Sequence, residues 1–91
     1  MQNKLLIPIS EFEKLLLEKI ISPPLAHDYM KIFCFHYYGT YTYQEGISKR
    51  DTKRTLFHLN TLSHFSLDNN YLRLTSRQIN IIMTTLWPKV V

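Results

Sequence analysis

The sequence predicts a single α+β domain that is mostly helical. Apolar residues recur at helical spacing in four segments, and two short alternating runs flank an Asp-Asn-Asn turn. A chain of 91 residues is also long enough for one hydrophobic core but not for two. We therefore expect one domain over residues 1–91. Its core segment would cover residues 24–75, with flanking helices at about 10–21 and 76–87.

The first helix is expected over residues 10–21. Ser10 followed by Glu13 matches a capping box, and proline at positions 23 and 24 ends the helix. Leu17 and Ile21 widen the apolar stripe beyond what one core contact needs. This helix therefore has more apolar surface than one core contact would cover.

The second helix is expected over residues 24–38, and Gly39 is its expected stop, since glycine tolerates the left-handed turn that closes helices. Residues 40–43 alternate and are rich in strand formers, which favours either a short strand or a one-turn helix capped by Thr42. The second helix has a broad apolar face, which comprises Leu25, Tyr29, Ile32, Phe33 and Tyr37.

A third helix is expected to begin after Ser48, which has Asp51 three residues later, and to run to about residue 62. The alternating runs at 64–67 and 71–74 predict a β-hairpin around the turn at 68–70. Thr75 and Gln78 form a second capping-box pattern, which begins a last helix that ends before Pro88.

Charge is distributed unevenly along the chain. The net charge is +4, but residues 1–45 carry −1 and residues 46–91 carry +5. Such an asymmetry is typical of contact with a polyanion, although ordinary surface charge kept for solubility explains it equally well.

The third helix carries most of this positive charge. At about 100° per residue, one side of this helix gathers Thr52, Thr55, Leu56, Leu59 and Leu62. Lys49, Arg50, Lys53 and Arg54 lie roughly opposite, and Asn60 and Thr61 extend this exposed face. Phe57 falls among the cations. A phosphate backbone would neutralise the four charges and release condensed counterions. The alternative is a solvated helix face with no ligand.

Residues 46–56, Gly-Ile-Ser-Lys-Arg-Asp-Thr-Lys-Arg-Thr-Leu, resemble the turn and recognition helix of bacterial helix-turn-helix proteins. With the hairpin as a wing, residues 24–75 resemble the winged-helix DNA-binding regulators of bacteria, phages or plasmids. A weaker resemblance exists to the all-helical regulators of adhesin operons and plasmid genes. The winged-helix resemblance implies contacts to double-stranded DNA from Ser48, Lys49, Arg50, Thr52, Lys53, Arg54, Phe57, Asn60, Asn69, Asn70 and Arg73.

Winged-helix regulators commonly pair through flanking helices, and two-fold symmetry matches palindromic half-sites. The surplus apolar residues Leu17 and Ile21 of the first helix, with Ile81 and Trp87 of the last, are the expected dimerisation surface. In the alternative interpretation the two helices cover one another within one chain. The expected function is a sequence-specific, homodimeric transcription regulator.

A protein-interaction module is the main rival. A small phage- or plasmid-encoded inhibitor could use the same scaffold to bind a protein partner, with Phe57 as an anchor in an acidic groove. The two hypotheses differ in whether the basic face binds duplex DNA at all.

Other classes of function lack sequence support. No phosphate loop, activated nucleophile or paired carboxylates point to an enzyme or to a cofactor. Cys34 and His36 are two residues apart on a helix and cannot share a metal ion. With no apolar run long enough for a membrane span and a lone cysteine, we expect a cytoplasmic protein.

Overall fold

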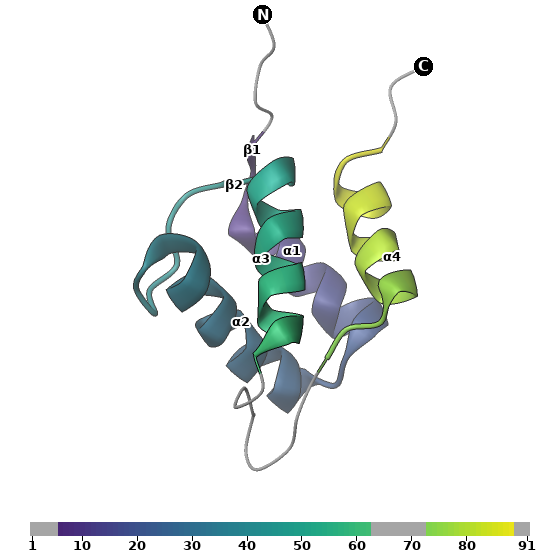
Figure 1. Ribbon diagram of the computed structural model, residues 1–91, viewed down its shortest axis with the longest axis horizontal. Coiled ribbons are helices and arrows are strands. Elements are labelled where there is room, and N and C mark those ends of the chain that lie inside the picture. The colour runs from purple at the N-terminus through teal and green to yellow at the C-terminus, as the bar shows by residue number, and fades with distance from the viewer. Residues whose placement is uncertain (1–5, 63–72, 89–91) are drawn as a thin grey trace, which may run out of the picture.

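The computed structural model describes residues 6–62 and 73–88, which form the helices and short strands of Figure 1. In chain order the elements are β1 Leu6–Ile7, α1 Ile9–Leu15, the π-helical turn η1 Leu16–Ile20, α2 Pro23–Tyr38, β2 Ile47–Ser48, α3 Lys49–Thr61 and α4 Ser76–Leu86. The described part of the chain is therefore mostly helical with a small antiparallel sheet, in agreement with the predicted α+β class.

The helices surround one core. α3 packs against α2 on one side and α4 on the other, while α1 contacts α2 and α4. In Figure 1 α3 lies in front and α1 behind it, so these two helices cover different sides of the core. Within residues 6–62 and 73–88, no helix covers the outward side of α3.

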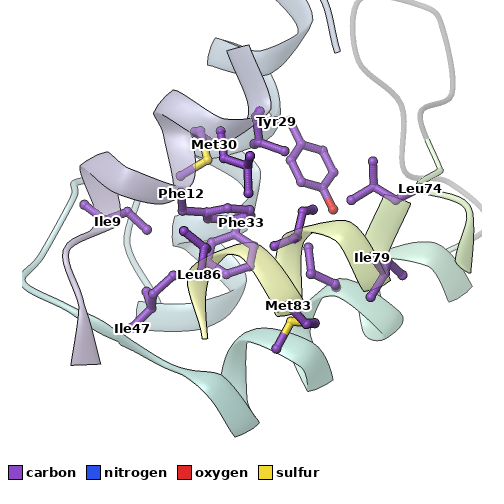
Figure 2. Close-up of a cluster of buried hydrophobic side chains, with 14 of the residues drawn as sticks. Ile9, Phe12, Tyr29, Met30, Phe33, Ile47, Leu74, Ile79, Met83 and Leu86 are labelled. Carbon is purple, nitrogen blue, oxygen red and sulfur yellow. The ribbon is translucent and has the colours of Figure 1, made fainter. Parts of the chain in front are cut away.

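The core draws on every helix and on β2. Figure 2 shows apolar side chains from α1, α2, α4 and β2 pointing into one cluster. At its centre the rings of Phe12 and Phe33 meet edge to face, with centroids 4.8 Å apart. Both rings are completely buried, as are Met30, Leu56 and Ile82.

The first helix begins earlier than predicted. It starts at Ile9 after Pro8, whose carbonyl oxygen accepts a hydrogen bond from the backbone N–H of Glu11 (2.9 Å). Ser10 lies inside the first turn and is exposed, so the capping box expected from Ser10 and Glu13 is wrong. Ile9 is buried, and its burial favours a helix that includes it.

The end of this helix widens into the π-helical turn η1. The backbone N–H of Ile21 donates to the carbonyl oxygen of Leu16 (3.0 Å), a span one residue longer than in an α-helix. The chain then becomes extended at Ile21 and enters α2 through Pro23. The predicted extent of this helix, residues 10–21, is therefore close to that observed.

α2 ends at Gly39, whose φ of 84° is the left-handed conformation predicted for the stop. Residues 40–46 then form neither the strand nor the one-turn helix expected at 40–45. Instead, the hydroxyls of Thr40 and Thr42 lie 2.7 Å apart, and Tyr43 reaches across to Glu13 of α1. Side-chain contacts rather than strand pairing hold this loop.

The small sheet pairs segments that are distant in sequence, and it was not predicted. β1 and β2 are antiparallel, with Leu6 opposite Ser48 and Ile7 opposite Ile47. Gly46 precedes β2 with φ of 75°, and a Cβ atom at this position would lie 3.1 Å from Cβ of Leu6. The left-handed conformation therefore favours glycine here, and any larger residue would also press against the side chain of Leu6 in β1.

The last helix agrees with prediction in detail. Thr75 and Gln78 form a complete capping box, and Ile79, Ile82, Met83 and Leu86 make the buried stripe. The predicted hairpin at 64–74 lies largely outside the described residues. Its last two positions, Arg73 and Leu74, are described and are not in a strand.

None of the helices in the described part of the chain is both long enough and apolar enough to cross a bilayer.

Candidate nucleic-acid interface

α3 forms because its start is capped and one of its faces is apolar. The hydroxyl oxygen of Ser48 accepts a hydrogen bond from the backbone N–H of Asp51 (3.2 Å), as its sequence position predicted. Thr55, Leu56 and Leu59 are buried on the side that faces the core. The helix is thus held along its length, and its opposite face is presented to solvent.

Two tyrosines at the end of α2 position the beginning of α3. The phenol oxygen of Tyr37 accepts a hydrogen bond from the backbone N–H of Ser48 (2.6 Å) and lies 3.4 Å from its hydroxyl. The phenol of Tyr38 donates to the carbonyl oxygen of Gly46 (2.6 Å). Burial, followed by the neighbouring Tyr37 and Cys34, raises the pKa of Tyr38 to about 12, so this phenol stays a donor at neutral pH.

The outward face of α3 is strongly basic. Lys49, Arg50, Lys53 and Arg54 are all exposed, as their helical positions predicted. Asp51 pairs with Arg54 at 3.1 Å, and this pair is solvent-exposed. The described residues provide no salt bridge for the other three cations, so the first two turns of α3 carry an excess positive charge.

Phe57 lies on the same outward face, with 45% of its surface exposed. It follows Lys53 by one helical turn, and His58 follows Arg54 in the same way. Aromatic rings therefore continue the basic face toward the end of the helix.

Two predicted DNA contacts lie in the interior instead. Thr52 is completely buried, and its hydroxyl has no hydrogen-bond partner among the described residues. Ser48 is 7% exposed and its side chain is engaged by the α3 cap and by Tyr37. The prediction that Thr52 touches DNA is therefore wrong, because this position faces the core with Thr55 and Leu56. Ser48 acts on the interface only by starting α3.

Asn60 has a structural role that was not predicted. Its Nδ2 donates to the carbonyl oxygen of Leu74 (2.7 Å), and the N–H of Leu74 donates to its Oδ1 (3.1 Å). Both Nδ2 and Oδ1 of Asn60 thus bind the backbone of Leu74, and the side chain is partly buried. Asn60 therefore ties α3 to the segment before α4, and its contact with DNA stays a prediction.

The remaining predicted contacts come from the expected wing. Arg73 is exposed, and its guanidinium lies 3.5 Å from the carbonyl oxygen of Leu62, just beyond the end of α3. Asn69 and Asn70 lie outside the described residues.

The predicted dimerisation residues have different environments. Leu17 is 41% exposed, and Ile21 and Ile81 are partly buried. Trp87 is only 5% exposed and belongs to the core, so its prediction as a free apolar surface is wrong. α1 and α4 are in contact within one chain, as the alternative interpretation of these two helices expected.

A group of titratable side chains gathers between α1, α2 and the loop at 39–46. The phenol of Tyr43 donates to Oε2 of Glu13 (2.9 Å), and Nδ1 of His27 lies 3.8 Å from the same oxygen. Burial and this hydrogen bond raise the pKa of Tyr43. Burial, with the charge of Glu13, also raises the pKa of Cys34 to about 11, so the thiol is protonated and unreactive at neutral pH. Among the described residues no three potential metal ligands cluster.

Exposed rings on α2 and on the following loop were not among the predicted site residues. The rings of Phe35 and Tyr41 are stacked, with centroids 4.7 Å apart, and are 42% and 58% exposed. A signal was available in the sequence, because Phe35 follows His27 and Lys31 at intervals of four and so falls on the polar face of α2.

Comparisons with protein-family models, with curated proteins and with solved structures find no match for this chain.

Proposed function

We propose that the protein binds double-stranded DNA through the outward face of α3 and acts as a sequence-specific transcription regulator. The supporting observation is the cluster of four exposed cations on two turns of one helix, with a single carboxylate among them. The attraction of these cations to phosphates offsets their mutual repulsion, and their binding releases counterions from the DNA.

The shape of α3 fits this role. The 13 residues of α3 make a helix about 20 Å long, and the major groove of B-DNA is wide enough to admit a helix. The cations occupy the N-terminal half, where the helix dipole also favours a phosphate. In the proposed complex Lys49, Arg50 and Lys53 contact phosphates or base edges.

A winged-helix architecture is part of this proposal. α3 would be the recognition helix and α2 would support it from behind, while the predicted wing lies largely outside the described residues. The connection between α2 and α3 is residues 39–48 and includes β2, so it is longer than the three- or four-residue turn of a helix-turn-helix pair. The phenols of Tyr37 and Tyr38, rather than a tight turn, would then hold α3 in position.

Titration of labelled duplex DNA at several salt concentrations tests the proposal. Arg50→Ala with Lys53→Ala removes two cations that have no salt-bridge partner among the described residues. If each contacts one phosphate, the slope of log K against log salt should fall by about 1.8. Lys14→Ala with Lys19→Ala is the matched control, since it removes the same charge from exposed positions on α1 and η1.

The control pair should keep most of the wild-type affinity and slope. Equal affinity for duplex DNA in the Arg50/Lys53 variant and the wild type would show that α3 is not the interface. Selection of bound sites from random duplexes then tests sequence specificity, and an enriched palindrome is expected from a homodimer.

A second candidate is a protein-interaction module with an acidic partner, which the exposure of Phe57 among cations favours. The absence of any shift of bulk genomic DNA at low salt would favour this function over the first. DNA binding that weakens steeply with salt would favour the first.

A further inference from the structure

A continuous set of exposed rings extends from α3 onto α2 and the loop behind it. We call this set the aromatic band and define it by Phe35, His36, Tyr41 and His58. The rings of His36 and His58 are 5.1 Å apart and join α2 to α3. Phe35 meets His36 edge to face at 5.4 Å and stacks on Tyr41 at 4.7 Å, with 17° between the ring planes.

The hydrophobic core does not use these rings. Phe12, Tyr29 and Phe33 are completely buried, whereas Phe35 and Tyr41 are about half exposed, and His36 and His58 are exposed as well. Two large apolar rings stacked on each other at the surface still leave their outer faces in water, which is unfavourable without a ligand.

The aromatic band begins where the basic face of α3 ends. His58 lies one helical turn after Arg54, and Arg54 lies one turn after Arg50. A ligand that follows the outward face of α3 therefore meets cations first and rings afterwards. Phe57, 45% exposed beside His58, adds a ring at the junction.

Cations followed by accessible rings are the combination that binds unpaired nucleotides, because the phosphates need positive charge and each base has a flat face that stacks on an aromatic ring. In a duplex the bases are stacked on one another, and side rings cannot reach their faces. The cations of α3 therefore suit the phosphates of a strand, and the aromatic band suits its unpaired bases.

We propose that the aromatic band is a subsite for unpaired bases, so that the protein prefers DNA in which a duplex adjoins a single-stranded segment. This inference rests on the proposed function, since the duplex part is held by α3. The outer ring face of Tyr41 stacks on a base, and Phe35 supports it from behind.

Anisotropy titration with three labelled probes tests the inference. The first is a blunt duplex, the second is the same duplex with a single-stranded extension of about ten nucleotides, and the third has the same extension without bases. For the wild-type protein we expect the extension with bases to tighten binding by about fivefold or more, and the abasic extension to give a clearly smaller gain. Extensions made of DNA and of RNA distinguish the two sources of unpaired bases.

Tyr41→Leu and Tyr41→Phe form the matched pair of variants. Leucine keeps an apolar side chain but removes the flat ring, whereas phenylalanine keeps the ring. We expect Tyr41→Leu to lose most of the advantage of the extension and Tyr41→Phe to retain it, with the affinity of both for the blunt duplex unchanged. Circular dichroism and thermal unfolding confirm that both variants fold.

The outcomes separate the two proposals. Equal wild-type affinity for the blunt and the extended probes overturns the subsite and leaves duplex binding intact. The subsite is also overturned if the abasic extension tightens binding as much as the extension with bases, or if Tyr41→Leu keeps the full gain from the extension. Either result would favour a protein partner for the aromatic band. Failure to bind the blunt duplex overturns the proposed function itself.

Discussion

Thr52 and Phe57 lie on the same helix and have environments opposite to what their side chains prefer. The threonine is completely buried and its hydroxyl has no partner among the described residues, while the phenylalanine ring is 45% exposed. A buried hydroxyl without a partner costs free energy, and so does a large ring left in water. At Phe57 the proposed ligand explains the cost, whereas the core position of Thr52 leaves its hydroxyl no role in binding.

Replacement of Thr52 by valine should therefore stabilise the protein. Valine has nearly the same shape and removes the buried hydroxyl, so we expect the free energy of unfolding to rise by about 1 kcal/mol. Thr52→Ser is the control, since it keeps the hydroxyl, loses a buried methyl group and should destabilise the fold. Urea denaturation measures both. An equal loss of stability in both variants, or a weaker affinity of Thr52→Val for DNA, would contradict the buried position.

The raised pKa of Cys34 predicts that the folded protein loses stability at alkaline pH. Its pKa is raised to about 11 in the folded protein, from an ordinary value of 9.0, by burial and by the charge of Glu13. The folded state therefore holds the thiol proton more tightly than the unfolded state does. This stabilisation is complete below about pH 9 and is lost as the pH rises to about 11.

The free energy of unfolding of the wild type should accordingly fall between pH 9 and 11, and that of Cys34→Ala should fall less steeply over this range. Denaturation curves at pH 8, 9, 10 and 11 would show it. Tyr38, whose pKa is raised to about 12, adds a loss at the upper end in both proteins. Identical pH slopes in the two proteins would exclude the thiol as a cause.

At the scale of elements, α3 is tied to neighbouring segments near both of its ends. Tyr37 holds the N–H of Ser48 at the beginning, and Asn60 holds the backbone of Leu74 near the end. The same two contacts also connect α3 to α2 and to the segment before α4.

Loss of the Asn60 side chain should destabilise the protein without acting on the interface directly. Asn60→Ala leaves the N–H and the carbonyl group of Leu74 without these partners, and we expect a cost of about 1–3 kcal/mol. Asn80→Ala is the matched control, because Asn80 is exposed on α4. Thermal unfolding of both variants and of the wild type measures the loss of stability. If Asn60→Ala unfolded like the wild type but lost DNA affinity, Asn60 would be a DNA contact after all.

The elements differ in how far they could be predicted. The start of α4, the cap of α3 and the stop of α2 at Gly39 were all predicted correctly, since each depends on residues within one helical turn. Residues 40–43 favour a strand by composition, but the rings of Tyr41 and Tyr43 instead contact Phe35 and Glu13. Phe35 lies on α2 and Glu13 on α1, so the strand preference of residues 40–43 could not indicate these contacts.

For the molecule as a whole, the packing of α1 against α4 changes the surface available for a second copy. Trp87 belongs to the core, and Leu17, at 41% exposure, is the predicted dimerisation residue most open to solvent. Ile21 and Ile81 are partly covered within the chain. A homodimer formed on this side would therefore be centred on Leu17.

Sedimentation velocity over a range of concentrations tests the homodimer. We expect the wild type to associate, and Leu17→Lys to shift the equilibrium toward the monomer of 10.9 kDa, because a charge would then enter an apolar interface. Phe57→Lys changes a side chain of similar exposure on α3 and should associate like the wild type. A wild type that stays monomeric at high concentration would rule out the homodimer.

Local sequence alone determined where three of the helices begin or end and which face of α3 is basic, because helical period and capping involve neighbours at most four residues apart. Only the tertiary structure decided that Thr52 and Trp87 are buried, that β1 pairs with β2, and that rings from α2, its following loop and α3 form one band. These features join residues separated by many positions in the chain. Their free energy comes from packing and burial, which depend on the whole set of neighbours brought together by folding.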